Sequence, residues 1–378
     1  GGMPVGHMQF VEIAREIDKK NVRLLVFDEP TAVLTESEAS LLLAAMKRLS
    51  SEGIAILFIT HRLDEVMEVA DNITILRDGE IVSRMPRSEA KLDRIAQLMV
   101  GRKIERPVLP PRKSEPSDKD IVLKVDNLKV DMPGERVRRL NLAVRRGEIL
   151  GIGGLAGHGK VGIANGVIGM YPASGQVTKD GAQIPLNDPK RALLSGMAFV
   201  SEDRRGVGLL LDESIEMNII LTAMQVQGKF LRPGALQNLR LEDRAAMKEH
   251  ALEVIRDLDI RCTGPSQLVR RLSGGNQQKV CLGRAFTMEP EVLWVSEPTR
   301  GIDVGAKQLV LDLLVKFNRE HGMTIVMTSS ELGELRKICD RIAIVYRGQI
   351  AGVLPPDASD VDFGLMMAGK SATLEEVS

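Results

Sequence analysis

The chain has 378 residues, of which 44% are hydrophobic and 27% are charged, and 51 lysine and arginine residues balance 51 acidic ones. This length allows about two domains with sizeable cores, and the zero net charge excludes a basic field that would attract nucleic acid in bulk. The three cysteines are widely scattered, which argues against a metal-binding spacing and favours a reducing compartment. The sequence has no run of about 18 apolar residues, so no membrane-spanning helix is expected.

The first 120 residues contain short apolar runs, amphipathic segments and one polar stretch. The runs Arg23–Phe27 and Ile54–Ile59 are typical of buried parallel strands. The segments Glu36–Leu49 and Leu63–Val69 have the periodicity of helices. Residues 106–120 hold four prolines and seven charges without an apolar period, and they predict a partly extended linker.

After the linker, strands and helices alternate again. Glu148–Gly153 predicts a strand, Lys160–Gly169 a helix, and Ser214–Ile260 a mostly helical region. Ser273 precedes the helical run Gln277–Met288 and is a good N-cap for it. This alternation predicts an α/β fold with parallel sheets.

An internal repeat relates the two ends of the chain. Order and spacing agree over about 70 residues with a shift of one residue, which makes chance similarity a poor explanation. The matched pairs are Leu24–Thr31 with Val292–Thr299, Ile56–His61 with Ile325–Ser330, and Ala70–Ile75 with Cys339–Ile344. Upstream of the first pair, Met3–Gln9 falls where Leu272–Gln278 falls in the second copy.

A glycine-rich turn joins the predicted strand Glu148–Gly153 to the helix that follows. A turn in this context can cradle phosphates with backbone N–H groups, and Lys160 can reach the β/γ oxygens. A glycine turn alone is weak support, because many such turns only change chain direction. The residues assigned to nucleotide binding are Gly154, Gly157, His158, Gly159, Lys160 and Val161. Val161 departs from the pattern, because a Ser or Thr hydroxyl is needed there to bind Mg²⁺.

Acidic residues follow the first apolar strand. Asp28 and Glu29 suit a metal-binding carboxylate and a carboxylate that polarises water, although adjacent acids at a strand end are also compatible with a solvated turn. His61 follows the next strand. A lone histidine is usually structural, so its assignment depends on its place in the repeat.

Leu272–Val280 reads Leu-Ser-Gly-Gly-Asn-Gln-Gln-Lys-Val and resembles the signature loop of ATP-binding cassette (ABC) transporters, in the form typical of sugar-uptake ATPases. The resemblance implies P-loop NTPase cassettes of the α/β class, with a RecA-like parallel sheet core and a helical subdomain. It assigns residues 1–105 to the C-terminal part of a first cassette, residues 106–120 to the linker and residues 121–378 to a complete second cassette. The helical subdomain would lie within Ser214–Ile260.

The resemblance also assigns roles to single residues. The signature loop closes over the γ-phosphate of an ATP held by the opposite cassette, so the two cassettes pair within the molecule. Asp28 would hold Mg²⁺, Glu29 would polarise the attacking water, and His61 would contact the γ-phosphate. Glu297 is the second-copy equivalent of Glu29. The remaining nucleotide contacts assigned by resemblance are Glu202, at the glutamine-loop position, and Ser273, Gly274, Gly275 and Gln278 of the signature loop.

The departures from the family pattern all fall in one of the two composite sites. Ser296 and Ser330 replace the metal-side Asp and the switch His of the second copy, and Pro4 and Val5 interrupt the first signature loop. Since Pro lacks an N–H, that loop is a poor phosphate ligand. We therefore expect one hydrolytic site and one site that at most binds nucleotide slowly.

The implied function is that of the tandem ATPase subunit of a bacterial sugar-type importer, for ribose, galactose, xylose or nucleosides, with ATP and Mg²⁺ as cofactors. Its partners would be integral-membrane permease subunits and, indirectly, a periplasmic or lipid-anchored solute-binding protein, with no nucleic acid, at the cytoplasmic face of the bacterial membrane. Two alternatives remain: a soluble tandem ABC protein acting on ribosomes, which the short proline-rich linker disfavours, and a catalytically dead nucleotide-binding remnant.

The sequence shows no phosphate loop for the first copy. The chain is therefore expected to be a fragment of a longer protein or a misassigned reading frame, without ATP hydrolysis at a transporter-like rate. The sheet of the first copy is expected to expose an edge and apolar surface.

Overall fold

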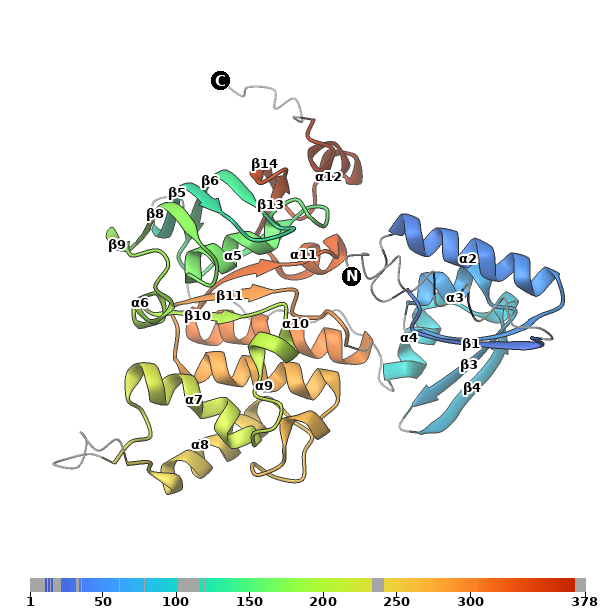
Figure 1. The fold of residues 1–378 in the computed structure, drawn as a ribbon, viewed down its shortest axis with the longest axis horizontal. Coiled ribbons are helices and arrows are strands. Elements are labelled where there is room, and N and C mark those ends of the chain that lie inside the picture. Colours follow the sequence, from blue (N-terminus) through green and yellow to red (C-terminus); the bar gives the residue numbers. More distant parts are fainter. Residues whose placement is uncertain are drawn as a thin grey trace. The chain divides into compact units, whose positions relative to one another are not determined.

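The computed structural model describes residues 11, 13, 15, 22–31, 34, 36–60, 62–77, 79–100, 116–117, 120–232, 241–302 and 304–370. These residues form two compact units, unit 1 made chiefly of residues up to Arg106 and unit 2 chiefly of residues from Pro107 (Figure 1). Most of the predicted linker 106–120 lies outside the described residues. No helix within the described ranges is both long and apolar enough to cross a bilayer.

Unit 1 contains two small sheets. Strands β1 and β2 pair in parallel, with Val26 opposite Leu57, and β3 and β4 form an antiparallel hairpin. The predicted strands and helices of this part are all present. Their bounds are β1 (Leu24–Asp28), α2 (Glu36–Ser51), β2 (Ala55–Ile59), α3 (Leu63–Val69), β3 (Asn72–Arg77), β4 (Glu80–Pro86), a 3₁₀ turn η1 (Arg87–Glu89) and α4 (Leu92–Val100).

One face of the β1–β2 sheet is apolar and open to solvent, as the sequence predicts. Alternate residues of a strand share a face, and paired strands align these residues in register. The exposed fractions on this face are 58% for Leu24, 58% for Val26, 53% for Leu57 and 47% for Ile59. The opposite face packs Phe27 against α2. Among the residues that the structure describes, only one side of this small sheet is therefore covered.

The main sheet of unit 2 has six strands in the order β10-β11-β12-β7-β13-β14, and every pair is parallel except β13–β14. Every residue of β7, β11 and β12 is buried, because a central parallel sheet is covered on both faces. The strands are β7 (Ile149–Gly153), β10 (Met197–Val200), β11 (Val292–Ser296), β12 (Thr324–Thr328), β13 (Arg341–Tyr346) and β14 (Gln349–Leu354).

A second sheet of unit 2, antiparallel and in the order β6-β5-β8-β9, was not foreseen. Its sequence signal is the apolar alternation of β6, where Leu140, Leu142 and Val144 are buried. Its strands are β5 (Ile121–Val130), β6 (Val137–Arg145), β8 (Ala173–Lys179) and β9 (Ala182–Ile184). Helix α5 (Lys160–Ile168) lies between the two sheets (Figure 1), which explains why all of its residues are buried.

The other face of the parallel sheet is covered by helices, and side chains alternate between the two cores along each strand. Leu293 and Val295 of β11 belong to the helical side, whereas Trp294 belongs to the α5 side. The predicted helical region contains α7 and α8, and α7 packs on α9. The helices and turns are α6 (Pro189–Leu194), a π-turn η2 (Arg204–Gly208), α7 (Ile215–Gln227), α8 (Arg244–Asp257), η4 (Val269–Arg271), α9 (Gly274–Thr287), α10 (Val304–His321), α11 (Leu332–Ile338) and α12 (Asp360–Met367).

Candidate functional site

The turn between β7 and α5 has a backbone that only glycine fits. Gly154 has a φ of 143°, and a Cβ atom there would lie 2.5 Å from the carbonyl oxygen of Val345. Gly159 has a φ of 97°, and its Cβ would lie 2.5 Å from the carbonyl oxygen of Arg136. The two distances of 2.5 Å leave no room for a side chain, and the positive φ angles also favour glycine. The loop therefore packs closely against Val345 of β13 and the β5–β6 turn.

Three backbone amides of this loop converge on one anion. The N–H groups of Gly157, Gly159 and Val161 donate to the carboxylate of Glu135 at 2.8, 2.9 and 3.3 Å. Consecutive amides at a helix N-terminus are a general binding arrangement for phosphate. The carboxylate stands in for a phosphate here, so the loop fits the anionic group predicted for it.

Lys160 begins α5 and is almost completely buried, with 1% of its surface exposed. Its Nζ lies 3.8 Å from Oε1 of Glu297. The carboxylate of Glu297 also accepts hydrogen bonds from the backbone N–H and the hydroxyl of Ser330, at 3.1 and 2.6 Å. Ser330, which stands where the family pattern has a histidine, therefore fixes the orientation of Glu297.

The loop has a second acidic neighbour, Glu202. Asn165 of α5 donates from Nδ2 to both carboxylate oxygens of Glu202 at 3.3 Å, and Ser201 donates at 3.4 Å. Burial raises the pKa of Glu202 above its ordinary value, although these hydrogen bonds oppose the effect. The predicted residues Lys160, Glu297 and Glu202 are thus all gathered around α5.

The metal ligands implied by the resemblance are missing from unit 2. Val161 has no atom that can bind a cation, and Ser296 offers a hydroxyl where the pattern has a carboxylate. The Ser296 hydroxyl is fully buried and has no hydrogen-bond partner among the described residues. Within those residues no cluster of His, Cys, Asp or Glu is arranged to hold a metal. Unit 2 therefore fits a phosphate but has neither the hydroxyl at 161 nor the carboxylate at 296 that the resemblance implies for Mg²⁺.

The signature loop lies at the start of α9. Ser273 is exposed and caps the helix as predicted, and its Oγ accepts hydrogen bonds from the backbone N–H and Nδ2 of Asn276 at 3.5 and 3.0 Å. Gly274 is partly exposed and Gly275 is buried. Gln278 is 3% exposed. Ser273 and Gly274 can therefore be reached by another molecule, whereas Gln278 packs inside unit 2.

Comparison with known proteins agrees with this arrangement. Residues 137–300 match the family model described as ABC transporter. The chain is 40% identical over 354 residues to a xylose import ATP-binding protein of Moorella thermoacetica, covering 92% of this chain and 67% of that protein. It is 37% identical over 375 residues to a ribose import ATP-binding protein of Rubrobacter xylanophilus, covering 98% of this chain and 71% of that protein.

The chain belongs to the ABC transporter family of ATP-binding proteins. Solved structures agree on the fold: a dimeric ATP-binding cassette with bound ADP and phosphate aligns with a TM-score of 0.52 at 22% identity, over 63% of this chain and all of that one. A nucleotide-free cassette aligns with a TM-score of 0.53 at 17% identity, over 66% and 95%. The predictions of an ABC-type P-loop ATPase and of a nucleotide-binding chain are confirmed at the level of the family.

Unit 1 of this ABC protein carries the other predicted carboxylates. Asp28 ends β1 and is exposed, and Glu29 follows it with a φ of 45°. The N–H of Glu29 donates to the carbonyl of Ile59 at 2.8 Å, as the N–H of Glu297, with a φ of 47°, does to Thr328 at 2.8 Å. The two copies thus share one backbone geometry at this carboxylate. His61 lies outside the described residues, as do Pro4 and Val5 of the predicted first signature loop.

Both copies also contain a buried carboxylate that the sequence analysis missed. Thr31 donates to Glu65 at 2.8 Å, and Thr299 donates to Glu334 at 2.6 and 2.7 Å. Glu65 and Glu334 are 4% and 5% exposed. The Thr of each Glu-Pro-Thr segment therefore donates to an acid from the second helix after it, Glu65 of α3 or Glu334 of α11. The repeat could have revealed this pair, because Glu65 and Glu334 are separated by the same shift as the matched segments.

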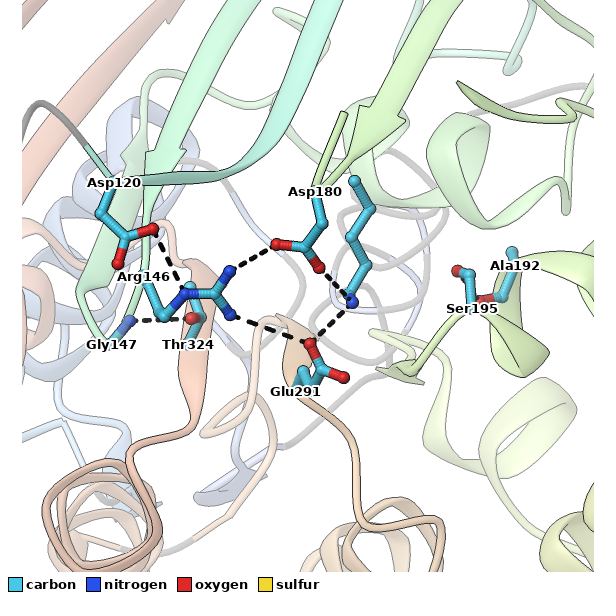
Figure 2. Close-up of polar contacts among 9 residues, drawn as sticks. Asp120, Arg146, Gly147, Asp180, Ala192, Ser195, Glu291 and Thr324 are labelled. Atoms are coloured by element: carbon cyan, nitrogen blue, oxygen red, sulfur yellow. Dashed lines mark hydrogen bonds and ion pairs between the residues drawn. The ribbon is translucent and has the colours of Figure 1, made fainter. Parts of the chain in front are cut away.

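A surface pocket of about 460 Å³ lies beside Lys179, Asp180 and Arg191, and none of its lining residues belongs to the phosphate loop. Figure 2 shows the charged network next to it, in which Arg146 bridges Asp120, Asp180 and Glu291. Lys179 donates to Asp180 at 2.8 Å and to Glu291 at 2.7 Å. Because these charges neutralise one another, the network ties β8 to the start of β11 and offers little to an anionic ligand.

Proposed function

We propose that the chain is the ATP-binding part of a bacterial importer for a sugar or a related small solute. The observation that carries nucleotide binding is the convergence of three backbone amides on one anion, beside the buried Lys160. The substrate class comes from the relatives, which are named for xylose and ribose import. These relatives do not favour a tandem ABC protein acting on ribosomes.

We further propose that unit 2 binds nucleotide without hydrolysing it at a useful rate. In unit 2, the amides of Gly157 and Gly159 would hold phosphate oxygens, and Lys160 would neutralise their charge. Glu297 is tied to Ser330 and lies close to Lys160, so it is poorly placed to activate water. The missing carboxylate at Ser296 and the missing histidine at Ser330 each remove roughly a hundredfold in rate.

Hydrolysis is assigned to a composite site that combines the two copies. Asp28 of unit 1 would hold Mg²⁺, Glu29 would polarise water, and His61 would contact the γ-phosphate. The exposed Ser273 and Gly274 of unit 2 would close over this nucleotide. The domain boundaries of this proposal are residues 1–105, 106–120 and 121–378. Integral-membrane permeases and a solute-binding protein complete the importer, and the ATPase lies on the cytoplasmic face of the membrane.

The nucleotide site of unit 2 is tested by measuring ATP binding to the chain by calorimetry, with and without Mg²⁺. Replacing Lys160 with Ala removes the buried cation and is expected to weaken binding by about tenfold or more, because one charge-assisted hydrogen bond is worth about 1.5–3 kcal/mol. Omitting Mg²⁺ changes the affinity of this site little. The exposed Lys190→Ala variant serves as the control. Equal affinity in Lys160→Ala and the original chain contradicts the proposal.

A further inference from the structure

The anion held by the phosphate loop belongs to the chain itself. Glu135 lies in the turn between β5 and β6, and its carboxylate accepts all three converging N–H groups, from Gly157, Gly159 and Val161. A phosphate bound by the same donors would need the same space. Glu135 and a nucleotide therefore cannot occupy these amides together.

The turn that carries Glu135 is packed closely on the loop. A Cβ on Gly162 would lie 2.1 Å from the carbonyl oxygen of Glu135. In addition, the N–H of Gly348 donates to the carbonyl of His158 at 2.7 Å, and the N–H of Arg138 donates to the carbonyl of Gly348 at 3.0 Å. These backbone contacts hold the turn against the loop, and none of them involves the side chain of Glu135.

The other acidic residue of this turn shows that the contact is selective. Asp131 lies in the same turn, but its carboxylate pairs with Arg136 at 2.9 Å and is exposed. Of these two acids, only Glu135, which is half-buried, accepts hydrogen bonds from the amides. An ionised acceptor forms stronger hydrogen bonds than a neutral one, so the contact stabilises the loop without nucleotide.

We propose that Glu135 is an autoinhibitory plug, an internal substitute for phosphate that must leave before nucleotide enters unit 2. The inference rests on the proposed nucleotide site and adds its regulation. An internal ligand lowers the apparent affinity for an external one, because the external ligand binds only the fraction of molecules whose site is open. Unit 2 therefore fills only at nucleotide concentrations that displace the carboxylate.

The test compares Glu135→Ala and Glu135→Gln with the original chain, and Asp131→Asn controls for the loss of a nearby negative charge. Calorimetry measures the binding of ATP and of inorganic pyrophosphate. We expect Glu135→Ala to bind both ligands roughly tenfold more tightly than the original chain. The affinity of Glu135→Gln is expected to lie between these two, and the affinity of Asp131→Asn is expected to equal that of the original chain. Equal or weaker binding by Glu135→Ala overturns the plug, as does an equal gain from Asp131→Asn.

Hydrogen exchange of the amides of Gly157, Gly159 and Val161, measured without nucleotide, separates the plug from the proposed function. Faster exchange in Glu135→Ala than in Asp131→Asn is expected, because the amides lose their acceptor. Unchanged exchange overturns the plug even if ATP binds. If no variant binds ATP or pyrophosphate but exchange is faster in Glu135→Ala, the proposed nucleotide site is overturned. The hydrogen bonds between Glu135 and the loop amides are then still supported.

Discussion

At the scale of single residues, the behaviour of each acid follows from its surroundings. Glu334 is buried beneath Thr299 and accepts a hydrogen bond from Ser329 at 2.9 Å. Burial, followed by the nearby charge of Glu331, raises its pKa, although hydrogen bonds and Lys307 oppose this. A carboxyl group with a raised pKa binds protons more tightly in the folded state than in the unfolded chain.

This shift predicts a pH dependence. The stability that Glu334 contributes is fully present below its unfolded pKa and is lost as pH rises through the raised folded pKa. Glu334→Gln removes this titration, so its stability relative to the original chain is expected to rise with pH across that window. Urea unfolding at a series of pH values from about 4 to 8 measures this difference in the free energy of unfolding. Glu320→Gln, at an exposed position, is the control. A difference that stays constant with pH contradicts the expected linkage.

Single residues also mark the limit of the sequence analysis. The glycines and Lys160 of the phosphate loop were predicted because they lie within a few positions of one another in the sequence. Glu135 was not, because it lies more than 20 positions before the amides that it contacts and reaches them only when the β5–β6 turn packs on the loop. Contacts of this kind depend on tertiary structure, and no pattern within a short window reports them.

At the scale of elements, local periodicity placed the strands and helices that it assigned close to their observed bounds. β7 was expected from Glu148 and begins at Ile149, and α5 was expected to end at Gly169 and ends at Ile168. The antiparallel sheet was missed because the apolar alternation of its strands was not used to assign any strand between residues 121 and 147. Its presence buries α5 on every side, which explains why the apolar residues of this helix are not confined to one stripe.

The link between β8 and β11 predicts a measurable loss of stability. A hydrogen bond from Lys179 chiefly lowers the pKa of Asp180, with Arg146 adding to the effect. Lys179→Met removes this bond and is expected to cost about 0.5–1 kcal/mol at neutral pH, since the partner carboxylates are partly exposed and screened. Lys124→Met, which breaks an exposed pair of β5, is the matched control.

The same substitution has a defined pH dependence. The stabilisation from Asp180 is present above its unfolded pKa and is lost as pH falls through the lowered folded value. Thermal unfolding at pH 7 and at about pH 3 is therefore expected to show a smaller difference between Lys179→Met and the original chain in acid. A difference that grows in acid contradicts this role of the network.

At the scale of the whole molecule, the sequence predicted the family correctly, whereas the domain bounds 1–105, 106–120 and 121–378 stay a prediction. The assignment of one hydrolytic and one degenerate site depends on how the copies pair, and it stays a prediction. In an importer assembled with its permeases, Glu29→Gln is expected to reduce steady-state ATP hydrolysis by roughly a hundredfold or more, whereas Glu297→Gln changes it little. Phosphate release measures both. Loss of turnover in Glu297→Gln with retention in Glu29→Gln contradicts the assignment.

Glu29 and Glu297 have almost the same left-handed backbone, although only one of them keeps an aspartate beside it. A left-handed conformation costs a residue other than glycine about 1 kcal/mol or more. Unit 2, which has Ser296 at the metal-side position, nevertheless has the same unfavourable corner, closed by the same N–H bond to the neighbouring strand. The strand and this backbone hydrogen bond therefore set the corner, and it forms with either an aspartate or a serine before the glutamate.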